Sequence, residues 1–236
     1  MRTIKIKDDK CKLRLNFSVL VFALFFLLSI AHYASAQSKV NDTEKTTQLI
    51  KSKYEKCKLK GKLSLEIFKR AYFGLEKLKL SKNIITIIDF DKPSTDKRFF
   101  VIDLKNEELL FETYTAHGKN SGVLYAKNFA NKMDSNQSSL GFYKTGSTYQ
   151  GEHGYSLRLL GLEKEINDKA YERAIVIHGA DYVSESFIKK NKRLGRSWGC
   201  PALPASLSKD IIDKIKNGTC LFIYATDDTY LTKSKY

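Results

Sequence analysis

The segment from residue 175 to residue 204 limits the possible fold and chemistry of this chain more than any other. An apolar run ends at His178 and predicts a buried strand. Cys200 follows in a Gly-Cys-Pro turn, where the proline disfavours helical backbone at the cysteine. The segment therefore predicts a histidine held on a strand and a cysteine held on a stiff turn.

His178 and Cys200 are the candidate catalytic pair. A thiol becomes a strong nucleophile when it loses its proton, and imidazole is the usual base. Pro201 has no N–H, so an oxyanion site near the thiol would use the backbone N–H groups of Trp198, Gly199 and Cys200. The alternative is a buried structural cysteine and a core histidine. The glycines that flank both residues favour catalysis.

The pattern resembles the L,D-transpeptidase catalytic domain of the YkuD-like family of cell-wall enzymes. That family has a strand ending in His-Gly, followed by Ser-x-Gly-Cys. His178-Gly179 and Ser197-Trp198-Gly199-Cys200 match it. The murein L,D-transpeptidase branch has Gly-Arg-Ser-Trp-Gly-Cys-Pro-Ala, as in residues 195–202 here. The likeness covers about residues 84–226.

The resemblance implies a cysteine-dependent transpeptidase that acts on peptidoglycan tetrapeptide stems through a thioester on Cys200. His178 would be the base, and Ser197 and Gly199 would complete the catalytic turn. An acceptor amine would give a crosslink, in cell-wall biogenesis or remodelling. The alternatives are a hydrolytic carboxypeptidase or endopeptidase with the same pair, or a non-catalytic wall-binding module.

Two departures from the family pattern concern the substrate side. Many relatives have histidine where this chain has Trp198, and an arginine shortly after the cysteine that is absent here. A contact to a substrate carboxylate must then come from elsewhere, and Arg193 and Arg196 are the nearest candidates. The expected substrate-binding residues are His153, Arg193, Arg196, Trp198 and Gly179.

The rest of the chain predicts a mostly β domain with flanking helices, an α+β fold. Runs rich in β-branched and aromatic residues predict strands. They lie at residues 84–90, 98–104, 109–116, 140–144, 156–160, 174–178 and 220–225. Helices are expected at residues 64–80, 184–192 and from about 204 to 215. The resemblance implies a mixed β-sandwich with the Cys–His site in a groove at one edge.

The first 36 residues predict a secretory signal peptide. A basic start precedes an apolar run at residues 17–30, which is shorter than a membrane span, and Ala-Ser-Ala follows at residues 34–36. We therefore expect export to the periplasm or cell envelope, with membrane contact only through this segment. Residues 37–80 are expected to form a polar linker and an amphipathic helix, and residues 81–236 the catalytic domain.

The net charge of +15 raises the question of an acidic partner. Nucleic acid is the usual partner of a basic chain, but export and the scattered lysines argue against it. An anionic cell wall fits better, and a solvated lysine-rich surface without a partner is the alternative. The sequence does not define an oligomeric state.

The number and spacing of cysteine and histidine residues indicate which disulfides and metal sites the chain could form. Without Cys11, which precedes the apolar run, three cysteines remain, so at least one thiol stays free or pairs with another molecule. A free Cys200 suits catalysis, and a bridge between Cys57 and Cys220 is left open. A zinc peptidase is the rival chemistry, but the sequence contains neither HExxH nor Cys-x-x-Cys. No metal or cofactor is expected.

Overall fold

The computed structural model describes residue 37, residues 43–80 and residues 83–236. The chain divides into two compact units, one ending at Gln48 and one from Leu49 to Tyr236. In the first unit, residues 43–48 are helical. The expected signal peptide lies outside the described residues. The sheet and the candidate site both belong to the second unit.

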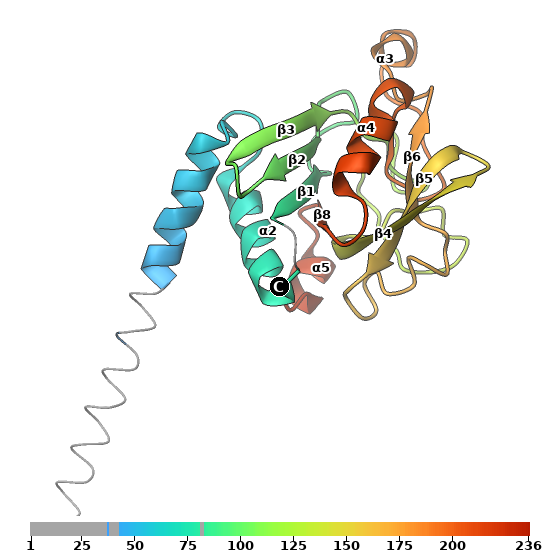
Figure 1. The fold of residues 1–236 in the computed structure, drawn as a ribbon. Coiled ribbons are helices and arrows are strands. Elements are labelled where there is room, and N and C mark those ends of the chain that lie inside the picture. The colour runs from blue at the N-terminus through green and yellow to red at the C-terminus, as the bar shows by residue number, and fades with distance from the viewer. Residues whose placement is uncertain (1–36, 38–42, 81–82) are drawn as a thin grey trace, which may run out of the picture. The chain divides into compact units, whose positions relative to one another are not determined.

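Eight strands form one mixed sheet in the order β3-β2-β1-β8-β4-β5-β6-β7 (Figure 1). The strands are β1 (Ile84–Asp89), β2 (Phe99–Asp103), β3 (Glu108–Thr113), β4 (Gly141–Gly151), β5 (Gly154–Gly161), β6 (Val176–Ala180), β7 (Ala202–Pro204) and β8 (Cys220–Tyr224). Ala116, just after β3, is bridged to Ala202 of β7, so the two edges approach each other and the sheet is nearly closed. The expected fold class, mostly β with flanking helices, is confirmed.

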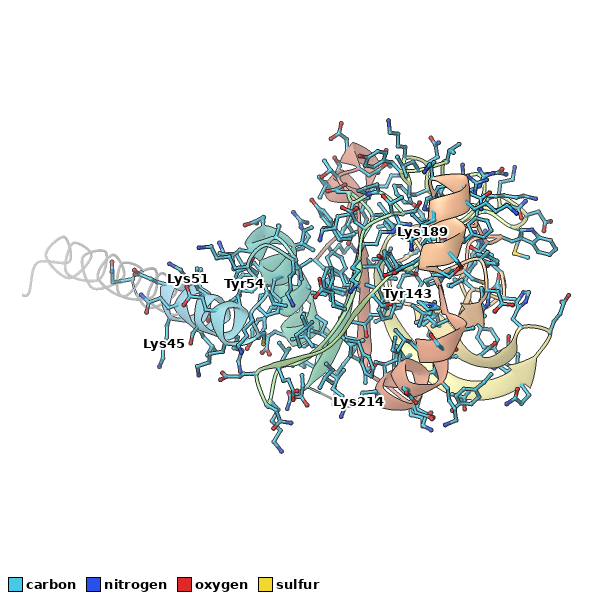
Figure 2. The ribbon with its side chains drawn as sticks, turned by 90° about the horizontal axis from the view of Figure 1, so that it is seen from above. Lys45, Lys51, Tyr54, Tyr143, Lys189 and Lys214 are labelled. Atoms are coloured by element: carbon cyan, nitrogen blue, oxygen red, sulfur yellow. The ribbon has the colours of Figure 1, made fainter. Side chains whose placement is uncertain are left out.

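The strands at the centre of the sheet are apolar on both faces. All of β2 and nearly all of β1 are buried, which matches their continuous runs of isoleucine, phenylalanine and valine. Burial of these runs is the main source of stability for such a domain. Tyr143 of β4 is also fully buried among the side chains of this interior (Figure 2).

Helices α2 (Leu65–Leu78) and α4 (Ala205–Ile215) pack against the sheet. Two shorter helices are α3 (Glu185–Asn191) and α5 (Asp228–Lys233). The Ser64 side chain accepts a hydrogen bond from the Ile67 N–H at the start of α2, as an N-cap serine should. The helix α4 buries Ile211, Ile212 and Ile215. The exposed α3 buries no side chain and carries Lys189 (Figure 2).

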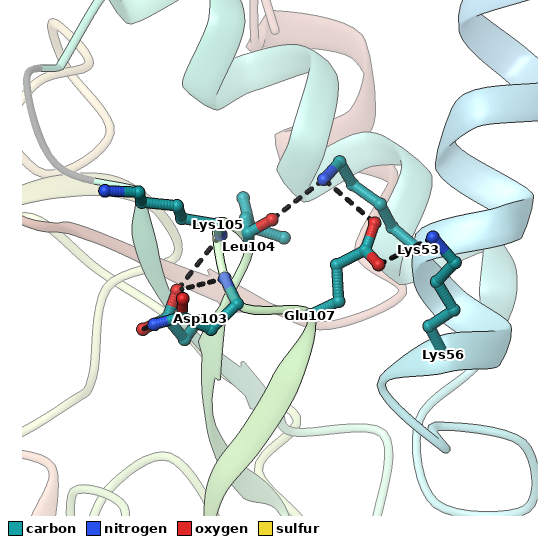
Figure 3. A network of polar contacts seen from close by, with 7 residues as sticks. Lys53, Lys56, Asp103, Leu104, Lys105 and Glu107 are labelled. Atoms are coloured by element: carbon teal, nitrogen blue, oxygen red, sulfur yellow. Dashed lines mark hydrogen bonds and ion pairs between the residues drawn. The ribbon is translucent and has the colours of Figure 1, made fainter.

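Residues 49–63, expected largely as part of the polar linker, contribute to the core. Residues 49–56 are helical, and Ile50 is fully buried. Lys53 Nζ donates to Leu104 O at 2.8 Å, and Lys53 and Lys56 pair with Glu107 at 3.4 and 2.7 Å (Figure 3). This segment therefore packs on the turn between β2 and β3. The turn itself is held by Asp103, which accepts from two backbone N–H groups (Figure 3).

The cysteines Cys57 and Cys220 are both buried and both free. The bridge that the sequence left open is therefore not formed in the structure. Burial raises the pKa of the Cys220 thiol to about 12, so this thiol is protonated at neutral pH. Cys57 and Cys220 behave as small core hydrophobes.

None of the helices in the described part of the chain is both long enough and apolar enough to span a membrane.

Candidate active site

His178 lies in β6, where it faces Ser156 of β5 on one side and Ala202 of β7 on the other. Its side chain is buried. Nδ1 lies 3.0 Å from Gly179 O. A carbonyl oxygen can only accept, so the proton is assigned to Nδ1 and Nε2 is left as the basic nitrogen. Burial lowers the pKa of His178, which is therefore neutral at pH 7.

Cys200 lies two residues before β7, beside the start of β6. The Val176 N–H donates to Cys200 Sγ at 3.4 Å, and the thiol lies 3.7 Å from Ala174 O. Burial raises the pKa of the thiol, while the Val176 N–H and the charge of Arg173 act in the opposite direction. The strand that carries His178 thus also contacts the sulfur.

A cavity of about 400 Å³ brings the two candidates together. His178 and Cys200 both line it, with His153, Arg196 and Trp198. Among the described residues, no hydrogen bond joins His178 to Cys200, and such contacts commonly tighten only when substrate binds. A larger cavity of about 540 Å³ between β3, α3 and α4 is lined by neither histidine nor cysteine. The smaller cavity is therefore the candidate active site because of the residues that line it, not because of its size.

Ser197 braces the cysteine turn. Its Oγ donates to Cys200 O at 2.6 Å and accepts from the Gly199 N–H at 3.1 Å. Gly199 has φ +129, and a Cβ there would lie 2.8 Å from Gln137 O, so only glycine fits. The Gly199 N–H is therefore occupied by Ser197. Of the three expected oxyanion donors, the N–H groups of Trp198 and Cys200 remain.

A second imidazole comes from the hairpin of β4 and β5. The ring of His153, in the turn between these strands, stacks on the ring of His178 with centroids 4.5 Å apart and planes at 23°. The charged form of His153 would repel that of His178, which adds to the effect of burial in lowering the pKa of His178. A second histidine is therefore present at this site, but it comes from the turn between β4 and β5 and not from the position of Trp198.

The other expected substrate residues are divided between the cavity and its surroundings. Trp198 is 74% exposed and its ring lies 5.7 Å from Lys119 Nζ. Arg196 lines the cavity and donates to Lys119 O at 3.1 Å. Arg193 donates to Leu194 O and does not line the cavity. Gly179 faces α4 instead, where a Cβ would lie 2.6 Å from the Ser208 hydroxyl oxygen.

Arg173 and Tyr182, which the sequence did not indicate, also line the cavity, as do Tyr149 and Glu152. Burial, and secondarily the charge of Cys200, raises the pKa of Tyr182 to about 12, so its hydroxyl is protonated at neutral pH. A Cβ on Gly195 would clash with the Tyr182 ring, which gives that glycine a packing role. Arg173 and Tyr182 both lie in irregular segments, where periodicity carries no signal.

Within the described part of the chain, no group of three histidine, cysteine or acidic residues is arranged to hold a metal ion.

His117 supports the site from the interior. It is buried, its Nδ1 lies 2.8 Å from Arg98 Nη2, and its Nε2 lies 3.2 Å from Gly122 O. Its carbonyl accepts from the Ser197 N–H at 3.0 Å, so it anchors the cysteine turn. Burial, helped by the charge of Arg98, lowers the pKa of His117 to about 3.

We expect this histidine to make the fold sensitive to acid. Its folded pKa lies below the unfolded value of 6.5, so its contribution is complete above pH 6.5 and is lost as pH falls toward 3. The loss between pH 7.5 and pH 5 should be about 2 kcal/mol. His117→Gln keeps an acceptor and a donor but cannot titrate. Urea unfolding at both pH values should show a smaller pH dependence for this variant, and equal dependence would contradict the account.

The nearly closed mixed sheet places a cysteine turn beside a strand-borne histidine, an arrangement in which a thiol can act as a nucleophile. A family model described as L,D-transpeptidase catalytic domain (YkuD_2) matches residues 59–224. The chain belongs to this family. The match begins before residue 81, where the sequence placed the start of the domain, and that boundary remains a prediction.

Solved structures give a more distant likeness. An L,D-transpeptidase from Mycobacterium smegmatis is 13% identical, with TM-score 0.39, over 61% of this chain and 59% of that chain. L,D-transpeptidase 3 from Mycobacterium tuberculosis is 10% identical, with TM-score 0.39, over 61% of each. The K307A mutant of the helical cell shape determining protein Pgp2 from Campylobacter jejuni is 14% identical, with TM-score 0.43, over 63% of this chain and 49% of that chain. The matched region thus spans less than two thirds of each of these proteins.

No curated protein has a sequence that matches this chain significantly.

Proposed function

We propose that this protein is a cysteine-dependent peptidoglycan L,D-transpeptidase that acts on tetrapeptide stems through a thioester on Cys200. The observation that carries the proposal is a cavity shared by the Cys200 thiol and by a buried His178 whose Nε2 is free to accept a proton. Membership of the family supports the class of reaction. The tetrapeptide substrate follows from the resemblance.

In the first half-reaction, His178 Nε2 takes the thiol proton as Cys200 Sγ attacks the carbonyl carbon between stem residues three and four. The N–H groups of Cys200 and Trp198 stabilise the oxyanion. The C–N bond then breaks, and His178 returns the proton to the amine of the departing D-alanine. The product is a thioester on Cys200 and free D-alanine.

In the second half-reaction, an acceptor amine attacks the thioester carbonyl. His178 takes a proton from the amine and gives it to the departing sulfur, which restores the thiol and forms the new amide. If water attacks instead, the product is a shortened stem with a free carboxylate. The same two residues thus serve crosslinking and carboxypeptidation.

The resting pair is neutral. Burial raises the pKa of Cys200 and lowers that of His178, and both shifts disfavour a thiolate–imidazolium pair before substrate arrives. Proton transfer then accompanies attack rather than preceding it, which is general-base catalysis. We infer that His153, Arg196 and Trp198 contact the stem, since all three line the cavity.

We also propose that the protein is exported and meets the anionic cell wall in the periplasm or envelope. The basic start, apolar run and Ala-Ser-Ala of residues 1–36 support export. N-terminal sequencing of protein recovered from the envelope should begin at Gln37, and an intact Met1 would contradict this.

The specificity test compares stem lengths. We expect a tetrapeptide stem to release D-alanine and a pentapeptide stem to react poorly. The cavity must hold the leaving residue as well as the acyl carbonyl, and one more residue displaces the terminal carboxylate. Chromatographic measurement of released D-alanine, or D-alanyl-D-alanine, decides this. Equal or faster cleavage of the pentapeptide would refute the proposed substrate.

A further inference from the structure

Arg173 makes an unusual set of contacts for an arginine beside a catalytic cavity. Its Nη1 donates to Ala130 O at 2.8 Å and to Ser139 Oγ at 2.5 Å. Its Nη2 donates to Ser135 Oγ at 3.1 Å and to Gln137 O at 2.7 Å. None of the ion pairs found in the described residues involves Arg173. The guanidinium therefore holds residues 130–139 without being neutralised by a carboxylate.

The segment that Arg173 holds lies against the cysteine turn. Gln137 O approaches Gly199 so closely that a Cβ would lie only 2.8 Å away. Ser138 Oγ donates to Gly199 O at 3.1 Å. Moving this segment would therefore move the backbone that precedes Cys200.

Arg173 is also linked to Cys200 through its own neighbour in the chain. It directly precedes Ala174, whose carbonyl contacts the thiol, and it lines the same cavity as the sulfur. Burial raises the pKa of the Cys200 thiol and lowers that of Arg173, and the charge of each group on the other opposes both shifts. The titratable and charged groups around this cavity are Arg173, His178, His153, Glu152, Tyr149, Tyr182 and Arg196.

We propose that Arg173 is a positioning residue for the Cys200 nucleophile. It fixes residues 130–139 against the Gly199–Cys200 turn, and it holds a positive charge near the sulfur that stabilises the thiolate as it forms. This inference rests on the proposed function, because only a reacting thiol needs such support. The competing explanation is that Arg173 merely fastens a loop, in which case its charge would have no effect on the sulfur.

The pH dependence of thiol alkylation separates these explanations. Iodoacetamide labelling of Cys200, followed by peptide mass mapping, is measured across pH in the unaltered protein and in Arg173→Gln and Arg173→Lys. Removing an opposite charge from beside an ionisable group disfavours its charged form. In Arg173→Gln the rate of Cys200 alkylation at pH 7 should therefore fall about tenfold, and the midpoint of its pH dependence should move to higher pH. Arg173→Lys keeps the charge and should keep the midpoint. Lys164→Gln is the control, because Lys164 is exposed and does not line this cavity.

An unchanged midpoint in a folded Arg173→Gln protein, or equal upward shifts in both variants, would overturn the inference. If Arg173→Gln does not fold, Arg173→Lys decides: an unaltered midpoint supports the role of the charge, and an upward shift refutes it. An unaltered protein that alkylates as expected but releases no D-alanine would refute the proposed function alone. Normal D-alanine release with a charge-independent midpoint would refute only this inference.

Discussion

Cys200→Ala is expected to abolish D-alanine release from a tetrapeptide stem, whereas Cys220→Ala should leave most of it. Cys200 lines the cavity beside His178. Cys220 is fully buried in the core, and burial raises the pKa of its thiol to about 12. Neither access nor ionisation would allow Cys220 to act as the nucleophile.

The two variants form a matched pair, since each removes one sulfur. Thermal unfolding of both proteins should accompany the kinetics, because loss of a buried sulfur from the core costs some stability. If Cys220→Ala retained its fold but lost as much activity as Cys200→Ala, the nucleophile would have been assigned to the wrong thiol.

His178→Ala should slow thioester formation by about 10²–10⁴-fold, the usual contribution of a general acid or base. The resting Cys200 thiol is neutral because burial raises its pKa, so attack requires a base that takes the proton during the step. His178 Nε2 is the basic nitrogen at the cavity, held there by the contact of Nδ1 with Gly179 O.

His153→Ala is the control for the loss of an imidazole. His153 stacks on His178 but lies in the turn between β4 and β5, whereas His178 lies in β6, whose first residue Val176 donates its N–H to Cys200 Sγ. Stopped-flow or quenched-flow measurement of acyl-enzyme formation should show a much larger loss for His178→Ala. Equal losses would mean that the two imidazoles act as one unit.

The strands could be predicted from the sequence because they depend on local patterns, and the same holds for a histidine on a strand and a cysteine in a turn; the catalytic role of this pair stays a prediction. Apolar runs predicted seven of the eight strands, with small differences at most of their ends and a larger one at the end of β4. The strand β7 was missed because Ala202–Pro204 is too short to show a period and contains a proline. The helix α5 was missed because it is short and mostly polar.

The arrangement of the site depended on contacts between distant segments, which no local pattern reveals. The strand β4 runs to Gly151, well beyond the predicted end at residue 144. This extension carries His153 over His178. Arg173 was missed because its partners lie 34 to 43 residues away in the chain. Gly179 was expected at the substrate because of its place in the His-Gly motif; a Cβ there would meet Ser208 of α4, and its contact with substrate stays a prediction.

Formation of a thioester on Cys200 can be measured directly from the intact mass of the protein after brief mixing with a tetrapeptide stem. A thioester on Cys200 predicts a gain in mass equal to the stem minus D-alanine, located on the Cys200 peptide and absent from Cys200→Ala. Cleavage without any adduct, retained in Cys200→Ala and abolished by a metal chelator, would contradict the account and indicate zinc-dependent hydrolysis instead.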